Sequence, residues 1–503
     1  MSNIIEGFYS FFDDNKNEEN RESGPLFSIF LNDLKLKQDL YGKTYYELIY
    51  KNIKNIFLCL KNIKNNILVI GEVQSGKTNN IIGITMNALD NDYDCVIIFG
   101  GSTNLLLKQT LKRIKDTLNN NLCDILLYDI NKNKSSLFSL KKDKTKIIIN
   151  VIKNKTQMQK ISAELNTISK NFKVLIIDDE CDYGSLNNGS SKNSAIYNEI
   201  VKIKNANNTK YIGITATPYA NLTNSKSNEI YPEAIVKLII EKNYTGIDFF
   251  NNKKYFEISQ LNKKDDNFSL DLLLKKFLIF YILLSSFVKK YTKLNVSSII
   301  NVDIDAKKHF ILKDKLFDIH AVFLRDLKNN NVIDYFEEVK KNLNKIAYFD
   351  NYDIEKYHNS IEVKVLNNKT KNEEINNNQN CIYIGGNLVS RGLTFENLIC
   401  ELMLNIREHK QPIDILLQRA RWFGYRNKKI NINEELEIYF SDLMKIFISQ
   451  NIKECFSEAK KINNFLYNEL LIDIITYDVK KIKEKLVDIK TELKFVKYSD
   501  KDK

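Results

Sequence analysis

The residues from Gly71 to Thr78, "GEVQSGKT", have the types and the spacing of a phosphate-binding loop. In such a loop the glycines let backbone N–H groups approach a phosphate at the start of a helix. Lys77 would neutralise the β- and γ-phosphates, and the hydroxyl group of Thr78 would ligate Mg²⁺. The alternative is a structural turn before a helix. The sequence favours ATP binding, through Gly71, Gln74, Ser75, Gly76, Lys77 and Thr78.

An acidic cluster follows the apolar run "VLII" and reads "DDECD" over residues 178–182. Hydrolysis of ATP needs one carboxylate to hold Mg²⁺ and another to orient and deprotonate the attacking water. Asp179 is the predicted magnesium ligand and Glu180 the predicted catalytic base. Taken alone, the cluster could be a solvated loop at the end of a strand. The separate phosphate loop favours the catalytic interpretation.

Hydroxyl side chains follow the next apolar run, in "GITATPYAN". Thr215 and Thr217 at this strand end can bond the acidic cluster and couple its state to a neighbouring unit. The alternative is an ordinary turn after a strand. Farther along, "GGNLVSRGLTFENL" places Ser390 and Arg391 beside glycines. This pair suits a phosphate of ATP or of nucleic acid, although the loop could also be a structural crossover.

The segment "QRARWFGYR" can be analysed geometrically if residues 413–425 form a helix. The apolar residues of this helix would form a stripe against a sheet. Gln418 and Arg421 would then share one flank, with Arg421 the best candidate to reach a phosphate of ATP and Arg426 the next. Arg419 would point away from the core and suits nucleic acid or solvent. Trp422 could stack a base, but packing against another element is favoured for so large an aromatic side chain.

The elements that must position these residues alternate between short apolar runs and longer helical segments. Runs that are apolar on both faces are typical of buried parallel strands joined by helices, so the sequence predicts an α/β fold. The predicted strands are "NILVIG", "DCVIIFGG", "KIIINVI", "VLIIDD" and "YIGITAT", and later "VSSIINVDI", "IEVKVL", "CIYIGG" and "LEIYF". The predicted division is a helical N-terminal extension at 1–60, one α/β unit at 61–245, a connecting helical segment at 246–290, a second α/β unit at 291–445 and a helical C-terminal region at 446–503.

Composition argues against zinc-binding, disulfide-bonded, secreted and membrane-spanning proteins, and it gives strong support to no single class. The net charge of +12 suits a polyanionic partner, but Lys, Asn and Ile are abundant from end to end, as an A/T-rich genome alone would produce. The seven cysteines contain no C-x-x-C pair, so neither a zinc site nor a disulfide framework is expected. No apolar run approaches the roughly 20 residues that span a bilayer, and the N-terminus is too acidic for a signal peptide. The expected location is the cytoplasm, without a membrane.

Together and in this order, these segments resemble the motifs of superfamily 2 helicases. The closer resemblance is to bacterial proteins with a Z1 domain, through "QSGKT", "DDECDYGS", "TATPYAN", "GGNLVSRGLTFENL" and "QRARWFGYR". This resemblance implies two tandem RecA-like domains, ATP in the cleft between them, and Arg421 and Arg426 as arginine fingers. It implies nucleic-acid contacts from Thr103, Asn104, Lys153, Asn154, Ser390 and Arg391. The chain departs from the family at Arg419–Ala420, where Met–Gly is typical. Relatives are associated with restriction or phage-defence gene sets, beside nucleases, methylases or MORC-like ATPases.

Three functions follow as hypotheses. The first is an ATP-dependent DNA helicase or translocase with nucleic-acid-stimulated hydrolysis. The second is an endonuclease of the Z1 type, whose local support is Asp353 followed by Glu362-x-Lys364. The third is an ATPase that uses its nucleotide state as a switch to recruit an effector protein.

Overall fold

The computed structural model describes the chain between residues 24 and 498, and each of its two compact units is considered by itself. Within these limits the positions left out are 38–44, 64, 101–103, 119–124, 129–144, 169–170, 187–194, 207, 224–228, 242–243, 248–255, 260–265, 293, 303–305, 359, 368–369, 371–378, 387–388, 390–392, 394, 396, 405–409, 425–428, 434–435 and 491. Unit 1 comprises Met1–Gly71, Gly76–Ile239 and Asp473–Val479. Unit 2 comprises Glu72–Ser75, Ile240–Ile472 and Lys480–Lys503.

Unit 1 is built on an eight-stranded sheet with the strand order β17-β7-β1-β6-β5-β2-β4-β3. All neighbours are parallel except β17 and β7, which are antiparallel. Both faces of the central strands are buried, which explains why they read as continuous apolar runs. The strands are β1 (Asn66–Ile70), β2 (Cys95–Gly100), β3 (Ile125–Tyr128), β4 (Lys146–Ile152), β5 (Lys173–Asp179), β6 (Asn208–Thr215), β7 (Ala234–Lys237) and β17 (Ile475–Thr476).

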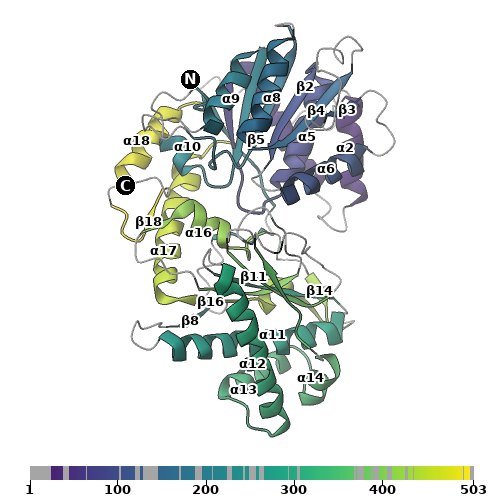
Figure 1. Cartoon of the computed structure of the whole chain (residues 1–503), viewed down its shortest axis with the longest axis vertical. Coiled ribbons are helices and arrows are strands. Elements are labelled where there is room, and N and C mark those ends of the chain that lie inside the picture. Colours follow the sequence, from purple (N-terminus) through teal and green to yellow (C-terminus); the bar gives the residue numbers. More distant parts are fainter. Residues whose placement is uncertain are drawn as a thin grey trace. The chain divides into compact units, whose positions relative to one another are not determined.

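Helices cover both faces of this sheet, with α8 beside α9 and α2 beside α5 (Figure 1). The predicted N-terminal extension contributes α2 and α4 to unit 1, where α4 contacts α5, β1 and β7. The Asp90 carboxylate accepts the backbone N–H of Phe27 at 2.9 Å and so caps the start of α2. The helices are α2 (Pro25–Leu36), α4 (Tyr45–Asn62), α5 (Lys77–Asp90), α6 (Asn104–Leu118), α8 (Lys155–Asn166), α9 (Ala195–Ala206) and α10 (Tyr219–Thr223).

Unit 2 contains a six-stranded, all-parallel sheet with the order β10-β11-β9-β12-β16-β8. Its strands are β8 (Phe256–Ser259), β9 (Ser297–Asn301), β10 (Val363–Leu366), β11 (Cys381–Gly385), β12 (Leu398–Met403) and β16 (Lys445–Ser449). Short pairs form between β13 (Gln411–Pro412) and β18 (Val496–Lys497), and between β14 (Lys429–Asn431) and β15 (Glu437–Tyr439). Two parallel α/β units therefore confirm the predicted fold class.

The prediction for unit 2 needs two corrections, although the run "LEIYF" does form a strand as predicted. The run "LEIYF" forms β15, which pairs antiparallel with β14 outside the main sheet. Conversely, β8 and β16 are strands of the main sheet, although both lie at or near segments predicted to be helical. The pairing of β8 with β16 joins residues 190 positions apart, so it depends on tertiary contacts that local sequence cannot reveal.

The long helix α11 (Asp266–Thr292) contacts α12, α13 and α14, which gather around it in Figure 1. Its stretch from Leu273 to Val288 is almost completely buried, as expected of a helix that packs on several sides. The remaining helices are α12 (Ala306–Lys328), α13 (Asp334–Asn344), α14 (Asn351–Tyr357), α16 (Ile413–Arg419), α17 (Gln450–Asn464) and α18 (Val479–Lys490).

A buried histidine pair joins α12 to the segment after α14, and it predicts acid sensitivity of unit 2. The Nε2 atoms of His320 and His358 lie 2.8 Å apart, so one ring donates to the other and at least one is neutral. Burial, and then the charge of His320, lower the pKa of His358 to about 4. As the pH falls, His358 becomes protonated in the unfolded chain before it does so in the folded one. The free energy of unfolding should therefore decrease by up to about 3 kcal/mol as the pH is lowered from roughly 6.5 to 4. Denaturant titration across this range, with His358→Gln as the comparison, measures the effect. Equal pH slopes in both proteins would contradict it.

Candidate active site

The predicted phosphate loop joins the end of β1 to the start of α5. Gly71 N–H donates to the carbonyl of Thr215 on β6 at 3.0 Å, which fixes the start of the loop against the sheet. Gly76 is the N-cap of α5, with φ +87° and ψ 25°, a left-handed conformation that favours glycine. Lys77 and Thr78 form the first turn of α5, where backbone N–H groups and the helix dipole favour an anion.

The N-terminal helix α4 also reaches this loop, through its first residue, Tyr45. Asn79 donates its side-chain amide to the Tyr45 hydroxyl at 3.0 Å, and a Cβ atom at Gly76 would lie 2.3 Å from the same oxygen. Tyr45 is 4% exposed. It therefore packs beneath the phosphate loop, and the sequence alone gave no indication of this contact.

The crowding at Gly76 predicts the effect of Gly76→Ala. A methyl group there would meet the Tyr45 hydroxyl and would have to adopt φ +87°. The left-handed conformation alone costs about 1–2 kcal/mol, so ATP affinity should fall by roughly 10-fold or more. Titration with a fluorescent ATP analogue measures this loss. Gly100→Ala is a matched control, because its nearest neighbours would be at 3.4 Å and 3.8 Å, which is ordinary contact. Equal affinities for the two variants would argue against this role of Gly76.

The acidic cluster occupies the end of β5 and the turn after it, and β5 is separated from β1 by β6. Asp178 is completely buried; it accepts a hydrogen bond from Tyr211 Oη at 2.7 Å and forms an ion pair with Lys153 Nζ, also at 2.7 Å. Asp179 stays partly exposed and accepts the N–H of Glu180 at 3.0 Å. Glu180 has φ +50°, which is rare for a residue with a side chain and typical of functional sites.

The charges in this cluster are crowded. Burial, followed by the negative charge of Glu180, raises the pKa of Asp179 above its usual range, while Lys77 and Lys153 oppose the rise. A divalent cation would relieve this crowding by stabilising the ionised carboxylates. The donor set thus fits Mg²⁺, with Asp179 and the Thr78 hydroxyl as the residues that would hold it.

Asp182 connects the cluster to β6. Its carboxylate accepts hydrogen bonds from Thr215 Oγ1 at 2.7 Å and from Thr217 Oγ1 at 3.0 Å, and all these side chains are buried. Thr217 N–H also donates to Thr215 Oγ1 at 2.9 Å. The predicted bonding of both threonines to the acidic cluster is therefore present.

Other predicted residues lie elsewhere or outside the described part of the chain. The prediction that Lys153 contacts nucleic acid is wrong, because its ammonium group is buried against Asp178. Asn154 caps α8 by accepting the N–H of Thr156 at 2.9 Å, and its side chain remains exposed. The backbone of Asn104 begins α6, but its side chain is not described. Thr103, Ser390, Arg391 and Arg426 also lie outside the described residues.

In unit 2, the predicted helix over 413–425 ends at Arg419, and α16 has only seven residues. Glu401 on β12 is one reason, because its carboxylate accepts the N–H of Arg421 at 2.9 Å. Gly424 is another, because it exchanges backbone hydrogen bonds with Thr245 and has φ +117°. The chain therefore turns to meet tertiary partners, and the helical phase assigned to residues 420–424 is wrong.

The shorter helix changes the assignments of its polar residues. Arg419, predicted to face solvent or nucleic acid, is 5% exposed, and Arg421 is 3% exposed. Arg421 Nη1 donates to the carbonyl of Gln418 at 3.3 Å, and the Gln74 amide donates to the carbonyl of Arg421 at 3.2 Å. Burial of Arg419 excludes the solvent-facing position that its predicted role required.

Trp422 is packed in the core, as favoured from the sequence. It has no exposed surface, and its ring centroid lies 5.2 Å from that of Phe456 on α17. Asp353, the first residue of the hypothetical nuclease arrangement, has a structural role at the start of α14. This carboxylate accepts Lys290 Nζ at 2.7 Å and the N–H of Asp350 at 3.0 Å, so it closes the capping box of α14.

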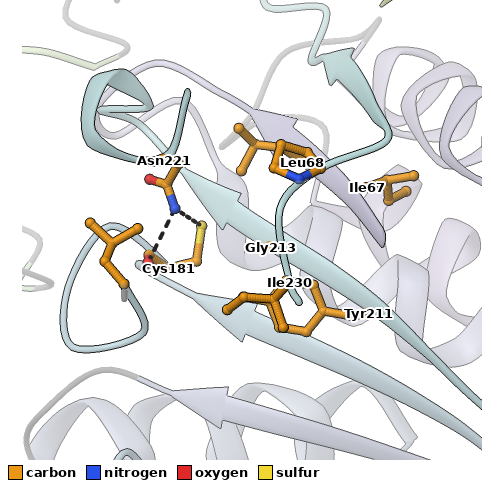
Figure 2. Close-up of a pocket in the computed structure, with 9 residues that line it drawn as sticks. Ile67, Leu68, Cys181, Tyr211, Gly213, Asn221 and Ile230 are labelled. Atoms are coloured by element: carbon orange, nitrogen blue, oxygen red, sulfur yellow. Dashed lines mark hydrogen bonds between the residues drawn. The ribbon is translucent and has the colours of Figure 1, made fainter. Parts of the chain in front are cut away.

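A small cavity lies behind the acidic cluster, lined by residues of β1, β6 and the turn after β5 (Figure 2). Figure 2 shows the Asn221 amide directed at Cys181, whose carbonyl and Sγ it contacts at 3.3 Å and 3.4 Å. The cavity has a volume of about 10 Å³, which suits a single water molecule. It is therefore too small for a nucleotide, and the phosphate loop remains the candidate nucleotide site.

The fold consists of two parallel α/β units, and the predicted phosphate loop follows β1 of the first sheet. Residues 43–220 match the model for "Type III restriction enzyme, res subunit", and residues 282–492 match the model for the Z1 domain. The family resemblance is thereby confirmed. The protein is an ATP-hydrolysing, helicase-like enzyme, and its residues 282–492 are similar to the Z1 domain.

The solved structures that match this chain are distant from it in sequence. S. cerevisiae Dbp5 bound to RNA and ADP BeF3 is 12% identical, with a TM-score of 0.47 over 93% of this chain and 98% of Dbp5. RecG bound to a three-way DNA junction is 12% identical, with a TM-score of 0.45 over 93% of this chain and 52% of RecG. The Type ISP restriction-modification enzyme LlaBIII bound to DNA is 14% identical, with a TM-score of 0.41 over 83% and 29%. No curated protein sequence matches the chain.

The described residues contain neither a membrane-spanning helix nor a cluster of metal-ligating side chains. None of the helices there has the length and apolar character needed to cross a membrane. The same residues contain no group of three or more His, Cys, Asp or Glu side chains that could hold a metal ion by themselves.

Proposed function

We propose that the protein is an ATP-dependent DNA helicase or translocase, the motor of a restriction-like or phage-defence system. The observation that carries this proposal is the bonding of Asp182 to both Thr215 and Thr217. A motor must pass the state of its hydrolytic cluster on to other elements, and these bonds link the cluster directly to the neighbouring strand. The match of residues 43–220 to a restriction-enzyme subunit supports DNA as the track.

In this proposal each candidate site residue of unit 1 has a defined role. The N-terminus of α5 and the Lys77 ammonium bind the β- and γ-phosphates of the substrate ATP. Glu180 orients the attacking water and accepts its proton. Thr78 and Asp179 would hold Mg²⁺, which supplies positive charge at the phosphates when bound.

The remaining assignments extend the proposal beyond unit 1. Arg421 and Arg426 act as arginine fingers, and Thr215, Thr217 and Gln418 couple hydrolysis to movement. Nucleic acid contacts Thr103, Asn104, Asn154, Ser390 and Arg391, whereas burial removes Lys153 and Arg419 from this set. Partner proteins are a nuclease, a methylase or a MORC-like ATPase, and the protein acts in the cytoplasm.

Steady-state ATPase rates with single-stranded DNA, duplex DNA, RNA or no nucleic acid test the function. The proposal expects DNA to stimulate turnover. Translocation is then measured by displacement of a triplex-forming strand, and unwinding by strand separation. A rate that DNA leaves unchanged, together with no DNA binding at low salt, would refute the motor and favour a nucleotide-switched ATPase.

A further inference from the structure

The side chain of Lys153 lies at the acidic cluster, a position that the local sequence around it does not predict. It follows β4, which is separated from β5 by β2, so its side chain must extend past one strand to reach the acidic cluster. Its ammonium group lies 2.7 Å from Asp178 Oδ1, 2.7 Å from the Glu180 carbonyl and 3.2 Å from the Tyr183 carbonyl. The side chain is only 3% exposed. The ammonium group therefore bridges the buried Asp178 carboxylate and the backbone of the turn that follows it.

That turn carries the proposed catalytic base in an unfavourable backbone conformation. Glu180 has φ +50°, and Tyr183 N–H closes the turn by donating to the Glu180 carbonyl at 2.9 Å. Such a conformation persists only when the surrounding structure holds it. Lys153 binds the carbonyls at both ends of the turn, so it contributes directly to holding Glu180 in place.

Lys153 also balances charge beneath the cluster. Asp178 is completely buried, and a buried carboxylate is stable only with a partner of opposite charge and hydrogen bonds. Burial alone would lower the pKa of Lys153, but attraction to Asp178 and the hydrogen bond between them outweigh it, so the pKa lies above its usual value. The lysine therefore stays protonated, with its donors available to Asp178 and to the turn.

We propose that Lys153 is a positioning residue of the hydrolytic site, which fixes the Glu180–Tyr183 turn and neutralises Asp178. This inference rests on the proposed role of Glu180 as catalytic base. It replaces the expected contact of Lys153 with nucleic acid. The lysine touches neither ATP nor water in this proposal and acts through the geometry of Glu180.

Lys153→Met tests the proposal, since methionine fills similar space without charge or donors. A small displacement of Glu180 should lower kcat by about 100-fold while the affinity for an ATP analogue changes by less than roughly threefold. DNA affinity should stay unchanged. Lys202→Met is the control, because Lys202 on α9 is 59% exposed and pairs only with Glu199 among the ion pairs of unit 1 that the structure describes. This control should keep the wild-type kcat.

Lys153→Met also leaves Asp178 charged and buried, which could prevent folding. The double variant Asp178→Asn, Lys153→Met removes that charge, and Tyr211 can still donate to the asparagine oxygen. It should therefore regain a cooperative thermal transition while kcat stays low, because the turn still lacks its donors. A folded double variant with kcat within about threefold of wild type would overturn the proposal.

Other outcomes separate this proposal from the proposed function. Loss of ATP affinity equal to the loss of kcat would show that Lys153 acts in binding, and loss of DNA affinity alone would restore the nucleic-acid role. Either result overturns the proposal. The Glu180→Gln variant tests the catalytic-base assignment separately from the positioning role of Lys153. If it keeps normal turnover, the assigned catalytic base is wrong, whereas its inactivity beside an active Lys153→Met protein would reject only the positioning role.

Discussion

Glu180→Gln should lower the kcat of ATP hydrolysis by about 10²–10⁴-fold while ATP binding is preserved. Glutamine keeps the shape of the side chain and can still orient a water molecule, but it cannot accept the proton. The left-handed backbone at residue 180 tolerates either side chain equally, so the turn itself should not change. Single-turnover hydrolysis and titration with an ATP analogue separate the chemical step from binding.

Lys77→Ala provides the contrast for this experiment. It removes the positive charge at the first turn of α5, so it should weaken nucleotide binding as well as turnover. Comparing the variants on single-stranded DNA, duplex DNA and RNA would show whether each nucleic acid stimulates the same chemical step. If Glu180→Gln loses ATP affinity as severely as Lys77→Ala, the separation of binding from catalysis at this site is incorrect.

Trp422→Ala should destabilise unit 2 by about 3–5 kcal/mol. The indole is completely buried and packs against Phe423 and Phe456, with ring centroids 5.6 Å and 5.2 Å away. Its removal leaves a cavity between α17 and the segment after α16. Trp422 is the only tryptophan of the chain, so wild-type fluorescence reports on this region alone. The Trp422→Ala variant lacks this fluorescence, so its unfolding is measured by circular dichroism.

A matched control for this truncation is Tyr352→Ala on α14, because Tyr352 is 67% exposed. Its loss should change the free energy of unfolding by no more than about 0.5 kcal/mol. Trp422→Phe should fall between the two, since it keeps an aromatic ring against Phe456. A Trp422→Ala protein as stable as the control would mean that the burial of this indole contributes nothing to unit 2.

The sequence predicted the parts of the site that local patterns encode. The run before Gly71, the glycine at position 76 and the helix after it are contiguous, so strand, loop and helix could be inferred together. The same holds for the strand ending at Asp179. Residues that act through distant partners could not be found. The reach of Lys153 past β2 and the contact of Tyr45 with Asn79 depend on strand order and helix packing, which no local signal reveals.

The error at residues 413–425 has the same origin. The spacing of Ile413, Leu416 and Leu417 is helical, and the structure follows it through Arg419. Beyond that point Glu401 and Thr245 supply hydrogen-bond partners that the helix would otherwise provide. Tertiary bonds therefore override the periodic pattern, and the two buried arginines could not be distinguished by helical phase.

The antiparallel strand β17 has a consequence for synthesis of the chain. It pairs with β7 at the edge of the unit 1 sheet, yet the ribosome must add about 240 further residues after β7 before β17 exists, roughly 10–50 s at ordinary elongation rates. During that interval β7 presents an unpaired edge, which is a template for wrong pairing between nascent chains. Truncation before residue 475 should make that exposure permanent, so shortened chains should aggregate even though every residue of the phosphate loop and the acidic cluster is present.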